Sequence, residues 1–256
     1  MSVRLKVLGC SGGIGGAHHT TSMLLDHDVL IDAGTGVTTL SLSELGRIDH
    51  VFLTHAHLDH LVSLPLLVDS VGFMRESPIT VYALPETLEV IRQHIFNWKI
   101  WPDFSVIPSP EKPYMRFQVI QHGETVSLAG RHITALPARH SVPAAGYQIS
   151  SGAGSLVFSG DTTTNDAFWE AVNAIPDLRY LLIEVAFSDG EETIAVLSRH
   201  LCPKLLEAEL EKFRGDAEVF ITHLKPGEVQ LIMDQVGRIP KGRTARMLLN
   251  NQEFVF

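Results

Sequence analysis

Short apolar runs bounded by polar residues, glycine or proline recur along the chain and predict a protein rich in β-strands. The predicted strands span residues 5–8, 29–31, 50–54, 79–82, 133–136, 146–149, 155–158, 180–184, 218–222 and 246–249. The predicted helices span residues 85–96, 165–174, 203–213 and 226–235. Pro85, Pro203 and Pro226 suit helix starts, where a missing N–H costs nothing. Helices interspersed among many strands predict an α/β fold with sheets inside and helices outside.

Length and composition are those of an ordinary globular protein. With 256 residues the chain is long enough for one large domain, so residues 1–256 are predicted to form a single unit. The hydrophobic content of 45% and the charged content of 19% are unremarkable for this class. A formal net charge of −9 argues against a large basic surface, so nucleic acid is not an expected partner. A small anionic substrate stays compatible with this charge, because bound cations reverse the local field.

The cysteines and the N-terminal residues indicate the cellular compartment in which the protein is expected. Cys10 and Cys202 lie far apart in the sequence, which favours reduced thiols over a disulfide framework. The first residues lead directly into a predicted strand without the apolar core of a signal peptide, and no apolar run is long enough to span a membrane. These features predict a cytoplasmic protein with no membrane partner.

The most specific pattern begins where the strand predicted at residues 50–54 ends, and it reads His-Ala-His-Leu-Asp-His over residues 55–60. Neutral imidazole and carboxylate groups are ligands for Zn²⁺ and similar divalent ions. Without a cation, four such groups crowded at a strand end would repel one another or stay poorly satisfied. The pattern therefore predicts a metal site, and the alternative is a solvated turn that is rich in histidine by chance.

This motif supplies too many ligands for one ion and too few for two, so further ligands are expected elsewhere in the chain. His140, Asp161 and His223 are the candidates, because each follows a predicted β-rich stretch. Loops at strand ends converge in layered α/β proteins while the strands hold them rigidly. We therefore expect these three side chains to lie near the histidine-rich motif.

The motif and the order of these residues resemble the metallo-β-lactamase superfamily over nearly the whole chain. The resemblance implies a four-layer αβ/βα sandwich, with two facing mixed sheets, helices outside and the site at one edge. It implies two divalent ions, with Zn²⁺ expected and Mn²⁺ or Fe also compatible with these ligands. The implied ligands are His55, His57 and His140 for the first ion and Asp59, His60 and His223 for the second. Asp161 would bridge both ions, and Asp32 would support the site from behind its ligands.

Three further segments are similar to class II 3′,5′-cyclic nucleotide phosphodiesterases. They are the leucine at position 58 within the histidine motif, the Phe-Asn-x-x-Ile-Trp-Pro segment at residues 96–102, and the series formed by Glu184, His200-Leu-x-Pro and His223-x-Lys-Pro. This similarity implies hydrolysis of cyclic AMP or cyclic GMP to 5′-nucleotides by a hydroxide that bridges the metals, in a chain that can form a homodimer. Residues 65–70 depart from the pattern of that family, which leaves the exact substrate open.

Asp59, His200 and Glu184 are the predicted catalytic residues. Asp59 acts as a ligand, while His200 is the candidate general acid for the leaving oxygen and Glu184 would orient it and keep it protonated. The alternative for His200 is a structural residue before the helix predicted at 203–213. Lys225 is either a phosphate contact or a helix cap. Asn97, Trp98 and Trp101 are candidates for a purine pocket, although core packing is the preferred role for Trp98.

Other functions remain open at this point. An RNase Z-like tRNA 3′-processing endonuclease shares the His-x-His-x-Asp-His motif and a His…Gly-Tyr segment like residues 140–147, but that family usually has glycine at the position of Leu58. A hydrolase of the same superfamily that acts on another substrate, such as a thioester or a lactam, is a further alternative. A scaffold protein without activity is disfavoured, because all seven predicted ligands are present.

Overall fold

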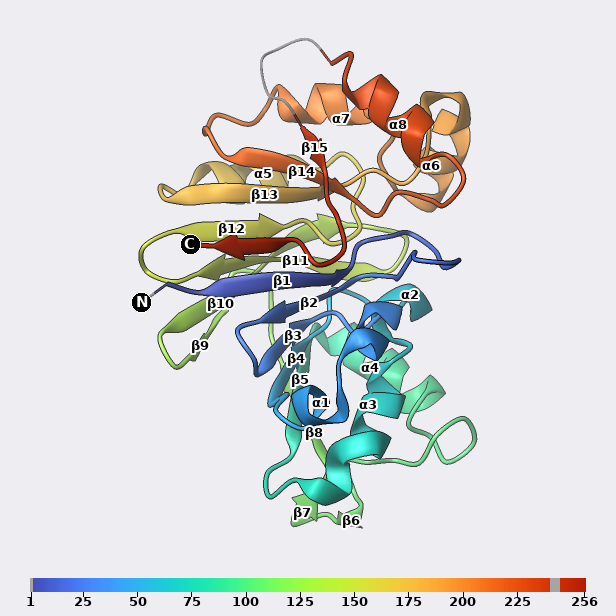
Figure 1. Ribbon diagram of the computed structural model, residues 1–256, viewed down its shortest axis with the longest axis vertical. Helices are drawn as coiled ribbons and strands as arrows, with labels where there is room; N and C mark the ends of the chain where they lie inside the picture. Colours follow the sequence, from blue (N-terminus) through green and yellow to red (C-terminus); the bar gives the residue numbers. More distant parts are fainter. Residues whose placement is uncertain (1, 240–244) are drawn as a thin grey trace.

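The apolar runs of the sequence pair into two facing β-sheets (Figure 1). The computed structural model describes residues 2–239 and 245–256, and within these residues each sheet has seven strands. The first sheet has the order β16 (Glu253–Val255), β1 (Arg4–Gly9), β2 (Ser22–Leu25), β3 (Val29–Ile31), β4 (His50–Phe52), β5 (Ile79–Ala83) and β8 (Met115–Val119). The second sheet has the order β15 (Arg246–Met247), β14 (Glu218–Thr222), β13 (Leu178–Glu184), β12 (Ser155–Phe158), β11 (Pro143–Ser150), β10 (Arg131–Arg139) and β9 (Thr125–Leu128). A small hairpin pairs β6 (Pro108–Ser109) with β7 (Lys112–Pro113).

Both sheets are mixed, and the parallel strands of each sheet lie together at one end of its order. β3, β4, β5 and β8 run parallel to one another, as do β12, β13, β14 and β15. All residues of β3 and β12 are buried. Strands that are covered on both faces consist of continuous apolar residues instead of alternating ones, which explains why these short runs were recognisable in the sequence.

Helices cover the outer face of each sheet. α1 (Leu42–Leu45), α2 (Leu58–Leu61), α3 (Leu64–Val71) and α4 (Pro85–His94) lie on the side of the first sheet. α5 (Asp166–Asn173), α7 (Pro203–Leu210) and α8 (Val229–Val236) pack on the second sheet, and α6 (Glu192–Ser198) lies at its edge. One apolar cluster fills the space between the sheets. A second lies between the first sheet and its helices, and a third between the second sheet and its helices. The predicted four-layer αβ/βα sandwich is therefore confirmed.

Several elements differ from the sequence predictions. Strands β2, β6, β7, β8, β9 and β16 and helices α1, α2, α3 and α6 were not predicted. The helix expected from Pro226 begins only at Val229, because Gly227 adopts a left-handed backbone (φ 99°) that ends the preceding turn. The strand expected over residues 246–249 is limited to β15.

Residues 189–192 are acidic except for Gly190, and they are folded. They form a 3₁₀ turn (Asp189–Glu191) that leads directly into α6. Lys204 closes this segment, because its Nζ lies 2.8 Å from Glu192 Oε2 and its backbone N–H donates to Asp189 Oδ1 at 2.8 Å.

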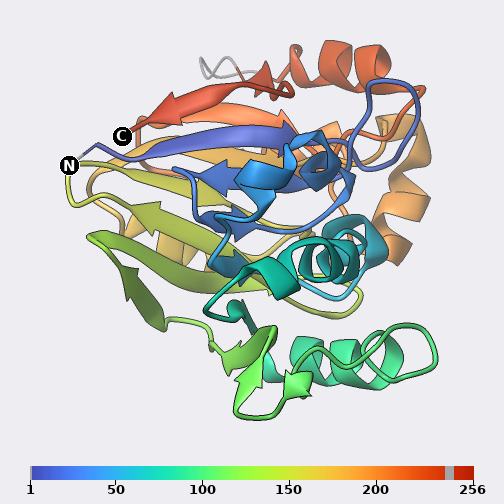
Figure 2. The same cartoon turned by 60° about the horizontal axis from the view of Figure 1, so that its bottom comes forward.

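The predicted site residues gather at one end of the sandwich. Both termini lie together at the opposite end in the two views of the molecule (Figures 1 and 2). Among residues 2–239 and 245–256, none of the helices has the length and apolar content needed to cross a membrane.

Candidate metal centre

The histidine-rich motif forms the turn between β4 and α2. His55 follows the buried end of the strand, His57 is the residue before α2, and Asp59 and His60 lie within this short helix. His60 is fully buried and its N–H donates to His57 O at 3.0 Å, so the turn is closed locally. One tight turn therefore holds four of the predicted ligands.

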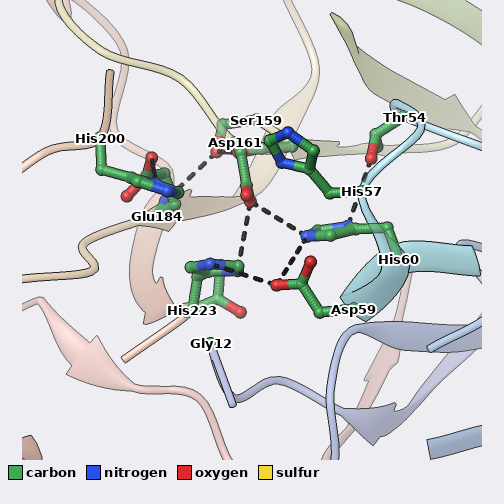
Figure 3. Close-up of polar contacts among 12 residues, drawn as sticks. Gly12, Thr54, His57, Asp59, His60, Ser159, Asp161, Glu184, His200 and His223 are labelled. Carbon is green, nitrogen blue, oxygen red and sulfur yellow. Dashed lines mark hydrogen bonds and ion pairs between the residues drawn. The ribbon is translucent and has the colours of Figure 1, made fainter. Parts of the chain in front are cut away.

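The other predicted ligands reach the same place from the second sheet. His140 follows β10, Asp161 follows β12 and His223 follows β14. Together with the motif they form two groups, His55–His57–His140–Asp161 and Asp59–His60–Asp161–His223, and the ligand atoms of each group lie within 4.8 Å of one another. Figure 3 labels the four residues of the second group. The structure thus brings all seven predicted ligand residues together.

Asp161 lies between the two groups. Its Oδ2 is 3.7 Å from His55 Nε2 and 3.9 Å from His140 Nε2, whereas its Oδ1 is 3.3 Å from His60 Nε2 and 3.2 Å from His223 Nδ1. Each carboxylate oxygen therefore faces one pair of histidines. Ligands bound about 2.0–2.2 Å from a tetrahedral ion lie about 3.3–3.6 Å apart, which is close to these separations.

Unpaired buried atoms test whether a cation fits this arrangement. His55 Nε2, His60 Nε2, Asp161 Oδ1 and both ring nitrogens of His223 are buried and have no hydrogen-bond partner within the described part of the chain. Burial of a polar atom without a partner costs roughly 1–3 kcal/mol, and here every residue that carries such an atom belongs to one of the two groups. Imidazole nitrogens and carboxylate oxygens gathered in this way are the donor set of Zn²⁺ and similar ions, so the residues present fit a metal.

Burial sets the protonation of most of these imidazoles. It lowers the pKa of His55 well below its usual value, that of His140 to about 4 and that of His223 to about 3, despite the opposing charge of Asp161. Burial acts against ionisation of Asp161 too, but His223 and His60 outweigh it and hold the pKa of this carboxyl well below its usual range. Three imidazoles are therefore neutral near pH 7 and the carboxylate is ionised, which is the state that binds a cation. His60 differs: burial lowers its pKa, but the charges of Asp161 and Asp32 outweigh burial and hold the pKa well above its usual value, so a bound cation takes the place of its proton.

A second set of contacts orients the ligands. Asp32 Oδ2 lies 2.7 Å from His60 Nδ1, and Asp32 also accepts hydrogen bonds from the N–H and the hydroxyl of Thr54 at 2.8 and 2.9 Å. His140 donates from Nδ1 to the carbonyl of Arg199 at 3.0 Å, which leaves Nε2 directed at the centre. Such partners fix which nitrogen is free to bind a metal.

Two of these residues have an unusual backbone. Asp32 (φ 58°) and His223 (φ 63°) adopt the left-handed conformation, which costs about 1–3 kcal/mol for a residue other than glycine and is concentrated at functional sites. His223 is held there by its N–H, which donates to Cys10 O at 2.8 Å, and by close packing against Gly12. A Cβ on Gly12 would lie 2.5 Å from His223 O and 2.9 Å from its Cδ2. The glycine-rich segment after β1 therefore lies beside the site.

His200 and Glu184 form a buried pair next to the two groups. His200 Nδ1 lies 2.8 Å from Glu184 Oε1, and the same carboxylate accepts the N–H groups of Thr162 (3.0 Å) and Leu201 (3.3 Å). The ring centroid of His200 is 4.7 Å from that of His140 and 5.2 Å from that of His223. Burial lowers the pKa of His200, but the charge of Glu184 outweighs it, so the pKa lies above its usual value.

The two sheets are joined directly at this edge. Ala145 of β11 donates its N–H to Thr54 O at 2.9 Å, and the buried hydroxyl of Tyr147 donates to Leu53 O at 2.8 Å. These bonds tie the second sheet to the residues that lead into the histidine motif. The relative position of the two ligand sets is therefore held by hydrogen bonds to the backbone.

The remaining candidates lie elsewhere or have other contacts. Asn97 closes a turn, since its Oδ1 accepts the N–H groups of Lys99 and Ile100 at 3.0 and 2.9 Å. Trp98 is 63% exposed, so the preferred expectation of core packing for it was wrong. Trp101 packs at the edge of the cluster between the first sheet and its helices.

Some contacts at the site had no signal in the sequence. Lys225 donates from Nζ to Gly12 O at 2.7 Å and thereby fastens the glycine-rich segment to the residues after His223. Arg199 acts through its backbone carbonyl, a group that every residue type carries, so its identity could not reveal the contact with His140.

The comparisons with known proteins agree with this geometry. Residues 27–244 match the family model described as the beta-lactamase superfamily domain. The chain belongs to the beta-lactamase superfamily. A probable 3′,5′-cyclic-nucleotide phosphodiesterase of Yersinia pestis is 29% identical over 203 residues, which cover 70% of this chain and 57% of that protein. A ribonuclease Z of Bradyrhizobium diazoefficiens is 30% identical over 145 residues, which cover 53% of this chain and 46% of that protein.

A solved structure shows the same fold. Unliganded yeast PDE1 superposes with a TM-score of 0.80 at 17% sequence identity, covering 99% of both chains. The chain spans about half the length of the curated relatives that it matches. The resemblance to the superfamily and to cyclic-nucleotide phosphodiesterases is confirmed.

Proposed function

We propose that this protein is a metal-dependent phosphodiesterase that binds two divalent ions, expected to be Zn²⁺, and hydrolyses 3′,5′-cyclic nucleotides to 5′-nucleotides. The observation that carries the proposal is the position of Asp161, whose two oxygens face different histidine pairs at 3.2–3.9 Å. A single-ion site does not need a carboxylate that is shared in this way. Ions bound in both groups would neutralise the phosphate and activate a water molecule as the nucleophile.

The protein's own residues supply the remaining steps. His200 uses Nδ1 to contact Glu184, and its Nε2 has no hydrogen bond within the described residues. We assign Nε2 as the proton donor to the leaving 3′-oxygen of the nucleotide, with Glu184 holding the ring in place. Proton transfer of this kind contributes roughly 10²–10⁴-fold to the rate.

The direct test is release of 5′-AMP from 3′,5′-cyclic AMP by protein loaded with Zn²⁺, followed by chromatography. We expect turnover that a chelator abolishes and that added metal restores. If two ions are bound and no 5′-AMP is formed, the cyclic substrate is wrong while the two-ion centre stands.

A tRNA 3′-processing endonuclease is the second candidate, and similarity to ribonucleases Z favours it. The net charge of −9 weighs against it, because RNA binding relies on clustered Lys and Arg. Cleavage of a tRNA precursor, with an affinity that falls steeply as salt rises, would favour this candidate over the first.

A further inference from the structure

A cavity of about 630 Å³ adjoins the proposed metal centre and shares His140 as part of its wall. The start of α4, the turn between β10 and β11, Gln121 and His122 between β8 and β9, and Arg139 and Arg199 form the rest of the lining. This volume lies within the range of sites that bind small molecules. The cavity and the metal centre therefore share one residue, His140.

Two guanidinium groups at this cavity have no carboxylate partner within the described residues. Arg199 donates from Nη1 to His140 O at 2.7 Å, and Arg139 has only a long contact of 3.5 Å with Thr164 O. In contrast, Arg131 of the same strand as Arg139 binds the carboxylates of Asp26 and Asp28. Each guanidinium has five N–H donors, so most of those on Arg139 and Arg199 remain available to a ligand.

The charges of the cavity favour an anionic ligand. Glu86, which is exposed at the start of α4, is the one carboxylate among the lining residues, against the two arginines. Arginine binds phosphate through two parallel hydrogen bonds, which makes it the preferred residue for this group. Both arginines flank His140 in space, one being its neighbour in sequence and the other its hydrogen-bond partner.

We propose that this cavity binds a second phosphate group of the substrate, so that nucleotide phosphodiesters with a further phosphate are preferred over cyclic AMP. The inference rests on the proposed function, because the scissile diester must occupy the metal centre. Two kinds of nucleotide have this chemistry: cyclic dinucleotides, and linear dinucleotides that carry a terminal phosphate.

Matched substrates distinguish these two kinds of nucleotide. We would measure kcat/KM for UpU against pUpU and UpUp, which add a terminal phosphate at either end, and for cyclic AMP against cyclic di-AMP. We expect at least one phosphate-bearing member to exceed its partner by about ten-fold or more, the gain expected from hydrogen bonds to a charged group. In Arg139→Ala this ratio should fall towards one, and Arg139→Lys should keep part of it. Arg116→Ala, an exposed arginine of β8 outside the cavity, is the control and should keep the full ratio.

A binding measurement gives a readout that does not require turnover. Calorimetry with the Zn²⁺-loaded protein would compare adenosine 3′,5′-bisphosphate with AMP, and we expect tighter binding of the bisphosphate by wild type and Arg116→Ala but not by Arg139→Ala. Equal affinities in wild type, or an unchanged preference in Arg139→Ala, would overturn the inference.

Hydrolysis of bis(4-nitrophenyl) phosphate reports on the metal centre alone. It therefore distinguishes a wrong assignment of the cavity from a wrong proposed function. If the loaded protein hydrolyses it but shows no preference for a second phosphate, the cavity assignment is wrong. If the protein does not hydrolyse any of these diesters but retains the preference for the bisphosphate, the proposed function is wrong and the anion site stands.

Discussion

The two sheets contribute to the candidate metal centre in different ways. The first sheet supplies four ligands from one turn between β4 and α2, so their spacing is fixed within six residues of sequence. The second sheet supplies His140, Asp161 and His223 from the ends of three strands, and their meeting depends on the pairing of the whole sheet. The first half is therefore built locally, whereas the second half exists only once the fold is complete.

Removal of Asp161 should have the largest effect, because it is the residue of the second sheet that faces both groups. We expect Asp161→Ala to lose bound metal and to lower turnover by more than the roughly 10–100-fold that loss of a supporting partner costs. Metal analysis and kinetics would check this, with Asp69→Ala, an exposed residue of α3, as the control. Two fully bound ions with normal turnover in Asp161→Ala would contradict the assignment.

Substitution of His200 tests whether the second sheet also supplies the general acid. We expect His200→Ala to keep its metal but to lose roughly 10²–10⁴-fold in kcat for a cyclic nucleotide. The loss should be much smaller for an activated nitrophenyl phosphodiester, whose leaving group needs no proton. Equal losses for both substrates would show that His200 is structural.

Gly12 supports the second-sheet ligand His223 from outside. In Gly12→Ala the new Cβ would meet the backbone oxygen of His223 at 2.5 Å, so this segment must shift. We expect metal affinity to fall towards the upper end of the 10–100-fold range, with the loss confined to the group that contains His223. Titration with Zn²⁺ would measure it, and Gly190→Ala, where the nearest atom is 3.7 Å away, is the matched control. An unchanged titration would show that the segment yields without moving His223.

Asp32 supports the first-sheet ligand His60 in the corresponding way. Asparagine tolerates the left-handed backbone at this position, so Asp32→Asn changes the charge that faces His60 Nδ1 while keeping the shape. We expect metal affinity to fall towards the lower, ten-fold end of that range, because the rest of the turn still holds His60. A loss as large as that of Gly12→Ala would show that the local turn does not hold its ligands independently.

The smallest expected effect concerns the contact between the sheets at Arg131. Burial raises the pKa of Asp28, but the hydrogen bond and charge of Arg131 outweigh it, so the pKa lies below its usual value. A carboxyl with a lowered pKa stabilises the fold above its unfolded pKa of about 4, and this stability is lost as pH falls through the folded value. A fall from pH 5 to pH 3 should therefore lower the stability of wild type more than that of Asp28→Asn. Thermal unfolding in EDTA across this range would measure the difference. Parallel curves for the two proteins would exclude this contribution.

The difference between the sheets also explains what the sequence could predict. Buried strands such as β3 and β12 were recognisable as continuous apolar runs, and the histidine motif was recognisable because its spacing is local. β8 and β9 carry exposed and half-buried residues, so they lack such a run. The four-residue helices α1 and α2 are too short to show a helical period.

Long-range contacts at the site could not be predicted from the sequence for a related reason. The grouping of the second-sheet ligands was predicted from strand ends and from the family resemblance, since no spacing relates Asp161 to His223. Contacts through backbone atoms, such as those of Arg199 and Ala145, leave no trace in residue type.

The hydrogen bond from Ala145 to Thr54 has a consequence for local opening motions of the protein. The amide of Ala145 is held across the two sheets in the buried edge of the sandwich, so solvent reaches it only when the sheets separate. Its exchange with deuterium should therefore be as slow as global unfolding allows, unlike amides in fraying loops. The distance between the two halves of the centre would then stay constant through every local opening of the molecule.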